Sequence, residues 1–358
     1  MSKTFYNLYD KICHQLNLWW AYKDAARGKR YQPAAAFFEY DLEKNLIEIE
    51  KELNNETYQP GGYHNFHIQK PKRRLISAAP FRDRVVHHVL MNIIEPLFER
   101  QFVFDSYANR QGKGTHAALD RCTYFLRRYQ YVMHLDVRQF FPSIDHEILL
   151  SILSRTIRDE RVMKMAGKII SGGAGVQADE YEMIYFPGDD LFAVNRPRGL
   201  PIGNLTSQHW ANVYLNELDQ YAKRVLKCRA YIRYVDDILL FADDKAALHE
   251  WRNEIISFLQ TLRLTIHETK AQPRPTSTGI SFLGFQVFPN YRRLKPANGY
   301  PFQRRLKRML ISVNNEELDQ KDFSGRLISW LNHAGYGDTR GLKKSILNKA
   351  RIYGGNDG

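Results

Sequence analysis

The sequence has no run of about 18 apolar residues, the length that a membrane-spanning helix needs. Its N-terminal residues, Met1 to Asp10, are mixed and polar and lack the apolar centre of a secretory signal peptide. Cysteine is scarce, and Cys13, Cys122 and Cys228 are too far apart to form a metal-ligand spacing. These absences predict a reduced, cytoplasmic protein.

Acidic residues are absent from one long segment, which runs from Thr269 to Asn315. The whole chain has 52 Lys and Arg against 39 Asp and Glu, which gives a formal net charge of +13. A second basic cluster lies near residue 70, and aromatic residues are interleaved with both clusters. Because cations hold phosphates while aromatic rings stack on bases, this pattern favours a nucleic-acid partner. From charge alone, a merely soluble basic protein is the alternative.

The P-loop pattern of many nucleotide-hydrolysing proteins is also missing. The segment Gly112-Lys113-Gly114-Thr115 is superficially similar to it but lacks the full spacing. We interpret this segment as a turn in a region that contacts nucleic acid.

Hydrophobic periodicity predicts an α+β protein. Helices are expected over residues 41–54, 85–100 with an interruption at Pro96, 204–226 and 246–262, with short helices from residue 303. Strands are expected over residues 131–137 with one buried face, 231–242 as two strands hinged at Asp236-Asp237, and 280–288. Residues 158–197 have the least pattern and are predicted to be a loop or insertion. The order strand, helix, hairpin, helix, strand indicates a split βαβ sheet backed by helices.

Two adjacent acids, Asp236 and Asp237, lie between apolar residues in Tyr234-Val235-Asp236-Asp237. An ordinary Asp-Asp turn is one interpretation. A third acid in a similar setting, Asp136 at the end of an apolar strand, favours a metal site instead, because clustered carboxylates need a cation. Two Mg²⁺ ions held this way can activate a 3′-hydroxyl and stabilise a leaving pyrophosphate. Such phosphoryl transfer needs only acids and basic residues, without a nucleophilic Ser or Cys.

Several ordered motifs between about residues 55 and 350 resemble those of reverse transcriptases. They are Lys70-Pro71-Lys72-Arg73-Arg74-Leu75-Ile76, Ser106-Tyr107-Ala108-Asn109-Arg110-Gln111-Gly112, Leu135-Asp136-Val137-Arg138-Gln139-Phe140-Phe141, Gly199-Leu200-Pro201-Ile202-Gly203-Asn204-Leu205-Thr206-Ser207-Gln208, Tyr234-Val235-Asp236-Asp237, Lys270 and Phe282-Leu283-Gly284-Phe285. The resemblance implies a right-hand polymerase fold of fingers, palm and thumb, with a ferredoxin-like split βαβ palm and a short helical thumb. It places an N-terminal helical extension at 1–55, fingers at 56–125, palm at 126–290 and thumb at 291–358.

The same resemblance implies residue roles. Asp136, Asp236 and Asp237 are expected to be catalytic and, with the Val137 carbonyl, to hold two Mg²⁺ ions, for which Mn²⁺ can substitute. The expected nucleotide-binding residues are Lys70, Lys72, Arg74, Phe141, Ile202, Gln208 and Lys270, with Phe141 as a steric gate against the 2′-hydroxyl. The expected nucleic-acid-binding residues are Arg110, Lys113, Arg292, Arg293, Arg304, Arg305 and Arg308.

Ile202 and Gln208 stand where most reverse transcriptases have Gln and Pro. The motif that contains Ile202 and Gln208 resembles that of the reverse transcriptases of diversity-generating retroelements. Two further segments resemble the same family, Asp105 to His116 and Ser329-Trp330-Leu331-Asn332-His333-Ala334. That resemblance implies error-prone cDNA, with errors at adenines, copied from a template-repeat RNA to diversify a target protein. It implies a bacterial or phage source and no maturase or endonuclease domain after the thumb. The implied partners are template RNA, the cDNA primer or product, deoxynucleoside triphosphates and a small basic accessory protein, with no membrane.

Three other interpretations stay open at this point. The nearest is a non-mutagenic bacterial reverse transcriptase of the retron or phage-defence kind, which would share the acids but copy faithfully. An RNA-dependent RNA polymerase is disfavoured because Phe141 would obstruct ribonucleotides. A catalytically silent RNA-binding protein is disfavoured because Asp136, Asp236 and Asp237 are all present.

Overall fold

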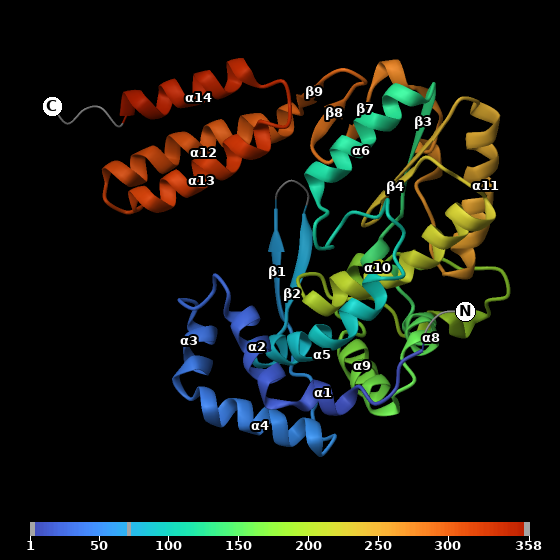
Figure 1. Ribbon diagram of the computed structural model, residues 1–358, viewed down its shortest axis with the longest axis vertical. Coiled ribbons are helices and arrows are strands. Elements are labelled where there is room, and N and C mark those ends of the chain that lie inside the picture. Colours follow the sequence, from blue (N-terminus) through green and yellow to red (C-terminus); the bar gives the residue numbers. More distant parts are fainter. Residues whose placement is uncertain (1–3, 70–72, 354–358) are drawn as a thin grey trace. The chain divides into compact units, whose positions relative to one another are not determined.

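The computed structural model describes residues 4–69 and 73–353 and contains both helices and sheets (Figure 1). The helices of its N-terminal half are α1 (Tyr9–Cys13), α2 (Gln15–Ala26), α3 (Pro33–Tyr40), α4 (Leu42–Asn54), α5 (Phe81–Glu99), α6 (Thr115–Arg128), α7 (Phe140–Ser143), α8 (His146–Thr156) and α9 (Glu160–Gly172). Those of the C-terminal half are α10 (Leu205–Gln220), α11 (Lys245–Thr261), α12 (Pro296–Asn314), α13 (Gln320–Ala334) and α14 (Arg340–Tyr353). None of the helices in the described ranges is long and apolar enough to cross a membrane.

Within residues 4–69 and 73–353 the strands form three sheets. The strands are β1 (His64–Ile68), β2 (Arg74–Ala78), β3 (Tyr131–Asp136), β4 (Tyr231–Tyr234), β5 (Asp237–Ala242), β6 (Arg274–Pro275), β7 (Ile280–Phe282), β8 (Phe285–Val287) and β9 (Arg292–Leu294). β1 and β2 form an antiparallel pair, and β7, β8 and β9 form another sheet. The four-stranded sheet has the order β4-β5-β3-β6, so the predicted strands at 131–137 and 231–242 share one sheet. The predicted last strand, 280–288, is not part of it, and the short strand β6 pairs with β3 instead. The finer division into fingers, palm and thumb stays a prediction.

The chain divides into two compact units. The first unit comprises Met1–Gly112, His134–Ile238 and Glu250–Ala271, and the second comprises Lys113–Met133, Leu239–His249 and Gln272–Gly358. In the first unit α5 is the central helix, because it packs against α1, α2, α3 and α10. Its buried residues include Val85, Val86, Leu90, Met91 and Ile94. All three predicted catalytic aspartates belong to this unit.

Several predicted elements were wrong in extent. α5 begins at Phe81 and continues through Pro96, because Ile94 and Phe98 are buried on either side of the proline and hold the helix against its neighbours. The predicted strand 280–288 is a hairpin, β7–β8, which turns at Leu283 and Gly284 with positive φ angles of 46° and 88°. The helices after residue 295 are not short, since α12 has 19 residues.

The region 158–197 was predicted to be a loop or insertion, and the loop alternative is wrong for its first part, which is helix α9. Asp159 caps this helix by accepting hydrogen bonds from the Arg161 and Val162 N–H groups, at 3.1 and 3.2 Å. The buried residues of α9 recur at helical spacing: Val162, Met165, Ala166, Ile169 and Ile170. The spacing of these apolar residues was therefore sufficient to predict the helix. The loop begins only after it.

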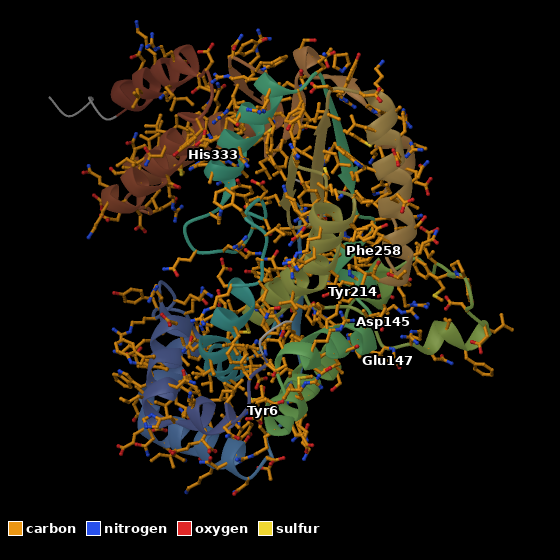
Figure 2. The ribbon with its side chains drawn as sticks, turned by 45° about the vertical axis from the view of Figure 1, so that its right-hand side comes forward. Tyr6, Asp145, Glu147, Tyr214, Phe258 and His333 are labelled. Atoms are coloured by element: carbon orange, nitrogen blue, oxygen red, sulfur yellow. The ribbon has the colours of Figure 1, made fainter. Side chains whose placement is uncertain are left out.

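Ion pairs hold the end of that loop within the first unit. Arg263 forms a two-fold pair with Asp189, with N–O distances of 2.6 and 2.7 Å. Arg196 pairs with Asp145 at 2.8 Å and with Glu147 at 2.7 Å, and Figure 2 labels both acids. Because the Asp145 carboxylate is buried, its contact with Arg196 is partly shielded from water and helps fix the chain just before Gly199, whereas the Glu147 side chain is exposed.

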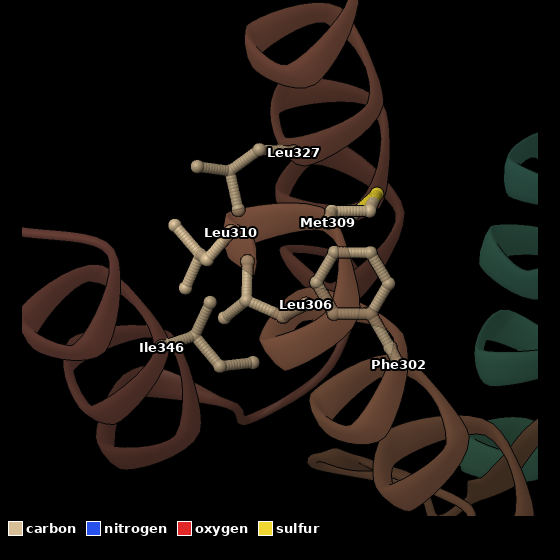
Figure 3. Packing of buried hydrophobic residues seen from close by; sticks show 6 residues of the cluster. All are labelled: Phe302, Leu306, Met309, Leu310, Leu327 and Ile346. Atoms are coloured by element: carbon tan, nitrogen blue, oxygen red, sulfur yellow. The ribbon is translucent and has the colours of Figure 1, made fainter. Parts of the chain in front are cut away.

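In the second unit α12, α13 and α14 share an apolar core (Figure 3). Its buried members are Phe302, Leu306, Met309, Leu310, Leu327 and Ile346. Arg304, Arg305 and Arg308 are exposed on α12, as its periodicity predicted. The helix is therefore amphipathic, with an apolar stripe in the core and cations in water.

A buried histidine of α10 makes the first unit sensitive to acid. His209 is 4% exposed and lies beside the rings of Phe98 and Phe102, at centroid distances of 5.8 and 5.9 Å. Burial lowers the pKa of His209 from 6.5 to about 3. As the pH falls, the His209 imidazole is protonated in the unfolded chain before it is protonated in the folded protein. The contribution of neutral His209 to the free energy of unfolding is therefore full above pH 6.5 and is lost as the pH falls toward 3.

We predict that His209→Leu reduces this acid loss. Between about pH 7.5 and about pH 5 the wild-type protein should lose about 2 kcal/mol of unfolding free energy through His209, which the Leu variant should keep. Urea unfolding at both pH values measures the difference. The same substitution at His64, which is exposed on β1, is the control and should leave the acid loss as it is. Equal acid losses in wild type and His209→Leu would contradict the prediction.

Candidate catalytic site

Strand β3 carries Asp136 at its C-terminal end. Val132, Met133 and Leu135 are all buried, so the strand is covered on both faces rather than on the single face that its alternation predicted. The Asp136 carbonyl accepts a hydrogen bond from the His267 N–H at 3.0 Å, and the Arg138 N–H donates to the Thr265 carbonyl at 2.8 Å. Backbone bonds on either side of Val137 therefore fix the place where Asp136 emerges.

The second acidic segment is the tight turn between β4 and β5. Val235 has a φ of 57°, a left-handed conformation that is rare and strained for a β-branched residue. The Val137 N–H donates to the Asp236 carbonyl at 3.3 Å. This bond joins the two acidic segments directly, so Asp136 and Asp236 lie on neighbouring pieces of backbone, as the sequence predicted.

The electrostatics of Asp236 reflect this crowding. Its pKa is raised from 3.8 to about 6, first by burial, and then by the negative charges of Asp237 and Asp136. The Arg74 guanidinium opposes the rise, so this cation also acts on the site. A buried carboxyl whose pKa is raised by neighbouring negative charges is stabilised in its ionised form by a nearby cation.

Asp237 is held differently from the other two acids. Its Oδ1 atom lies 2.6 Å from Nε2 of His134, which stands two residues before Asp136 on β3. Within residues 4–69 and 73–353 no group of three or more His, Cys, Asp or Glu side chains is gathered closely enough to hold a metal ion. The Val137–Asp236 backbone bond joins the segments of Asp136 and Asp236, and Asp237 is bonded to His134 on β3.

The pair nevertheless fits the preferences of Mg²⁺. Mg²⁺ takes oxygen ligands, keeps several waters, and is usually held by one or two carboxylates together with substrate phosphates. A closed cage of protein ligands is not required. Of the four predicted metal ligands, the structure joins Asp136, Val137 and Asp236 through the Val137–Asp236 backbone bond, and the charge of Asp237 also acts on Asp236.

The predicted nucleotide-binding residues come from several elements, and of these the Arg74 charge acts on Asp236. Arg74 is exposed at the start of β2, whereas Lys70 and Lys72 lie outside the described residues. The Ile202 carbonyl accepts a hydrogen bond from Ser77 of β2 at 2.9 Å, which links the Gly199–Gln208 motif to that strand. Gln208 lies in the first turn of α10 and is half-buried, and Lys270 is exposed three residues after His267.

Phe141 occupies the short helix α7, five residues after Asp136. It is half-buried, and its ring lies beside the buried ring of Phe140, with 5.5 Å between the ring centroids. Its carbonyl accepts a hydrogen bond from the Leu200 N–H at 2.9 Å. The predicted gate is thus attached to the motif that contains Ile202.

The predicted nucleic-acid-binding arginines separate into two groups. Arg304, Arg305 and Arg308 on α12 and Arg293 on β9 are exposed, while Lys113 is half-buried. Arg110 instead points inward: its side chain is 6% exposed, pairs with Glu99 at 2.8 Å and donates to the Val103 and Ser106 carbonyls. Arg292 is also engaged, with Asp120 at 2.7 Å and Thr123 at 2.9 Å.

Sequence reasoning did not identify three polar residues that shape the site. His134 holds Asp237. Asn204 is buried and bonds the Ala79 N–H and the Ser77 and Pro201 carbonyls, which ties the Ile202 motif to the end of β2. Arg233 is buried on β4 next to the acidic turn. A charged residue inside an apolar strand was the available signal for Arg233.

Residues 65–287 match the family described as Reverse transcriptase (RNA-dependent DNA polymerase). Because this match covers more than half of the chain, the protein belongs to the reverse transcriptase family, which confirms the resemblance seen in the motifs at that level.

Individual relatives are distant. Protein YkfC of Escherichia coli strain K12 is 25% identical over 279 residues, covering 67% of this chain and 70% of YkfC. The group II intron-encoded protein LtrA of Lactococcus lactis subsp. cremoris is 24% identical over 182 residues, covering 50% of this chain and only 28% of LtrA. A solved structure of apo telomerase from Candida tropicalis, truncated from the C-terminal domain, has a TM-score of 0.44 at 11% identity, covering 70% of this chain and 60% of that chain.

Proposed function

We propose that the protein is an RNA-directed DNA polymerase that extends a primer by transferring nucleotides from deoxynucleoside triphosphates. The observation that carries the proposal is the backbone bond between Val137 and Asp236, which sets two acids on adjacent segments. Membership of the reverse transcriptase family supports the same activity. The raised pKa of Asp236 also agrees with a site built to receive a divalent cation.

Asp136 and Asp236 would hold Mg²⁺, with the Val137 carbonyl and Asp237 as further oxygen donors beside them. When bound, Mg²⁺ supplies charge stabilisation for an attacking 3′-hydroxyl and a departing pyrophosphate. Arg74 is suited to hold triphosphate oxygens, because its guanidinium can bind two of them at once. Phe141 would lie against the sugar and exclude a 2′-hydroxyl, and Ile202 would line the side of the nascent base pair.

The direct test is primer extension on an RNA template with all four deoxynucleoside triphosphates and Mg²⁺. Extension that depends on the RNA template and is lost with EDTA supports the proposal. Substitution of Mn²⁺ for Mg²⁺ should also support synthesis. If no product forms, the assay is repeated with a cognate RNA and accessory protein, and continued failure would count against the activity.

The finer part of the proposal is that synthesis is error-prone at template adenines and serves a diversity-generating retroelement. It rests on the resemblance of the Ile202 to Gln208 motif, and on the absence at residue 202 of an amide that can hydrogen-bond the incoming nucleotide. On the basis of the same resemblance, a template-repeat RNA and a small basic accessory protein are the proposed partners. Faithful cDNA would instead favour a retron-like or phage-defence enzyme.

We predict that Ile202→Gln lowers misincorporation opposite adenine by about tenfold, because one restored hydrogen bond discriminates by about 1–2 kcal/mol. Sequencing of the cDNA from both proteins on one RNA template measures the change. Ile202→Leu is the matched control, since it keeps an apolar side chain and should keep the error rate. If Ile202→Gln leaves the errors at adenine unchanged, residue 202 does not set fidelity.

A further inference from the structure

Arg233 is the most deeply buried charged residue near the candidate site. It lies on β4, three residues before Asp236, and both its side chain and that of its partner Asp219 on α10 are 0% exposed. A buried ion pair is costly to desolvate and often contributes little net stability. Its presence beside a strained acidic turn therefore calls for a reason other than stability.

The guanidinium of Arg233 uses all five of its N–H donors. Nε and Nη2 each donate a hydrogen bond to one of the two Asp219 oxygens, both at 2.7 Å. The other Nη2 hydrogen reaches the Asn212 carbonyl at 3.5 Å, and Nη1 reaches Asn212 Oδ1 at 3.1 Å. The fifth donor, on Nη1, bonds the carbonyl of Val235 at 3.1 Å.

That last bond reaches the strained point of the turn. Val235 has a φ of 57°, which a β-branched residue keeps only when its surroundings hold it there. The Arg233 backbone is itself fixed, since its N–H donates to the Asp105 carbonyl at 2.9 Å and its carbonyl accepts from the Tyr107 N–H at 3.0 Å. Asp219 fixes the guanidinium in turn, through its hydrogen bonds to Nε and Nη2.

We propose that Arg233 is a positioning residue, which holds the Val235 carbonyl so that the turn presents Asp236 toward Asp136. The expected effect on kcat rests on the proposed polymerase function. The expected effect on cation binding rests on the geometry of the turn alone. Lys in this position has three donors in a different arrangement and cannot serve Asp219 and Val235 together.

Three variants separate positioning from folding. Arg233→Lys keeps the charge for Asp219 but loses the planar fork. The double variant Arg233→Met with Asp219→Leu replaces the ion pair by apolar groups, which preserves burial and leaves Val235 without its donor. Tyr231→Phe is the matched control, because it removes a hydrogen bond from the same Asp219 and leaves the Arg233–Val235 bond in place.

The readouts are thermal melting, Mn²⁺ binding to the protein alone by electron paramagnetic resonance, and the kcat and KM of primer extension. For both Arg233 variants we expect Mn²⁺ affinity and kcat to fall by about tenfold while KM for the nucleotide changes by less than about twofold. Tyr231→Phe should keep the wild-type Mn²⁺ affinity and kcat, even if its melting temperature falls as far as those of the Arg233 variants.

The proposal is overturned if both Arg233 variants bind Mn²⁺ and turn over like Tyr231→Phe. It is also overturned if neither variant folds, because Arg233 would then serve the fold rather than the turn. A wild-type protein that binds Mn²⁺ but makes no cDNA even with a cognate RNA and accessory protein would refute the proposed function. The binding comparison among the variants would still decide the role of Arg233.

Discussion

Replacing Asp236 by Asn should reduce RNA-templated DNA synthesis by about a thousandfold or more while leaving the protein folded. Asn keeps the size and shape of the side chain but has no negative charge to hold a divalent cation. The Val137–Asp236 bond is unaffected, because it uses the backbone carbonyl of residue 236. The loss would therefore report on the charge and not on the shape of the turn.

The same variant should melt at a higher temperature than the wild-type protein without divalent metal. The pKa of Asp236 is raised from 3.8 to about 6, so the folded state binds this proton more tightly than the unfolded state. Stability from this group is therefore present below pH 3.8 and is lost as the pH rises through about 6. Above that window the ionised carboxylate costs about 3 kcal/mol, which Asn removes.

Melting in EDTA between about pH 4 and about pH 8, together with primer extension, measures both effects. Mg²⁺ should raise the melting temperature of the wild type but not of Asp236→Asn. Asp244→Asn is the control, because Asp244 is exposed and caps α11 through the Ala246 N–H, a role that Asn can also fill. Synthesis that survives in Asp236→Asn would show that the acid pair is not the catalytic centre.

The acidic pair was predictable because its signal is local. Asp136 and Asp236 each stand at the end of a short apolar strand, and the strand pattern is visible in the sequence. Two strands of one sheet that each end in an acid predict carboxylates at the same level. In the strand order β4-β5-β3-β6 the neighbour of β3 is β5, which begins at Asp237, and the Val137–Asp236 backbone bond joins the end of β3 to the turn before β5.

Arg110 and Arg233 show where sequence reasoning stops. Arg110 was assigned to nucleic acid by its motif, yet Glu99 and two carbonyls enclose it. Arg233 drew no assignment, although its five hydrogen bonds reach three other residues. Whether an arginine faces water or a buried acid depends on segments distant in the chain, which neither periodicity nor motif spacing reports.

Phe141→Ala should admit ribonucleotides. Phe141 follows Asp136 by five residues, and its carbonyl accepts a hydrogen bond from Leu200 of the motif that contains Ile202. On the proposed function we expect its ring to lie beside the sugar of the incoming nucleotide. Removing the ring leaves space for a 2′-hydroxyl that the wild type would reject by steric overlap. The ratio of kcat/KM for deoxynucleotides to that for ribonucleotides should fall by about 10–100-fold.

The fall should come mainly from better use of ribonucleotides, because a deoxynucleotide lacks the group that the ring excludes. Phe141→Tyr is the matched control and should keep the discrimination, since it retains a ring of the same width. Single-nucleotide extension with each sugar on one RNA template measures the ratio for all three proteins. If Phe141→Ala still extends with deoxynucleotides and its ratio equals that of Phe141→Tyr, selection of the sugar lies elsewhere. A ratio that falls in both variants would instead mean that the Phe140–Phe141 packing, and not the ring as a barrier, sets the position of the sugar.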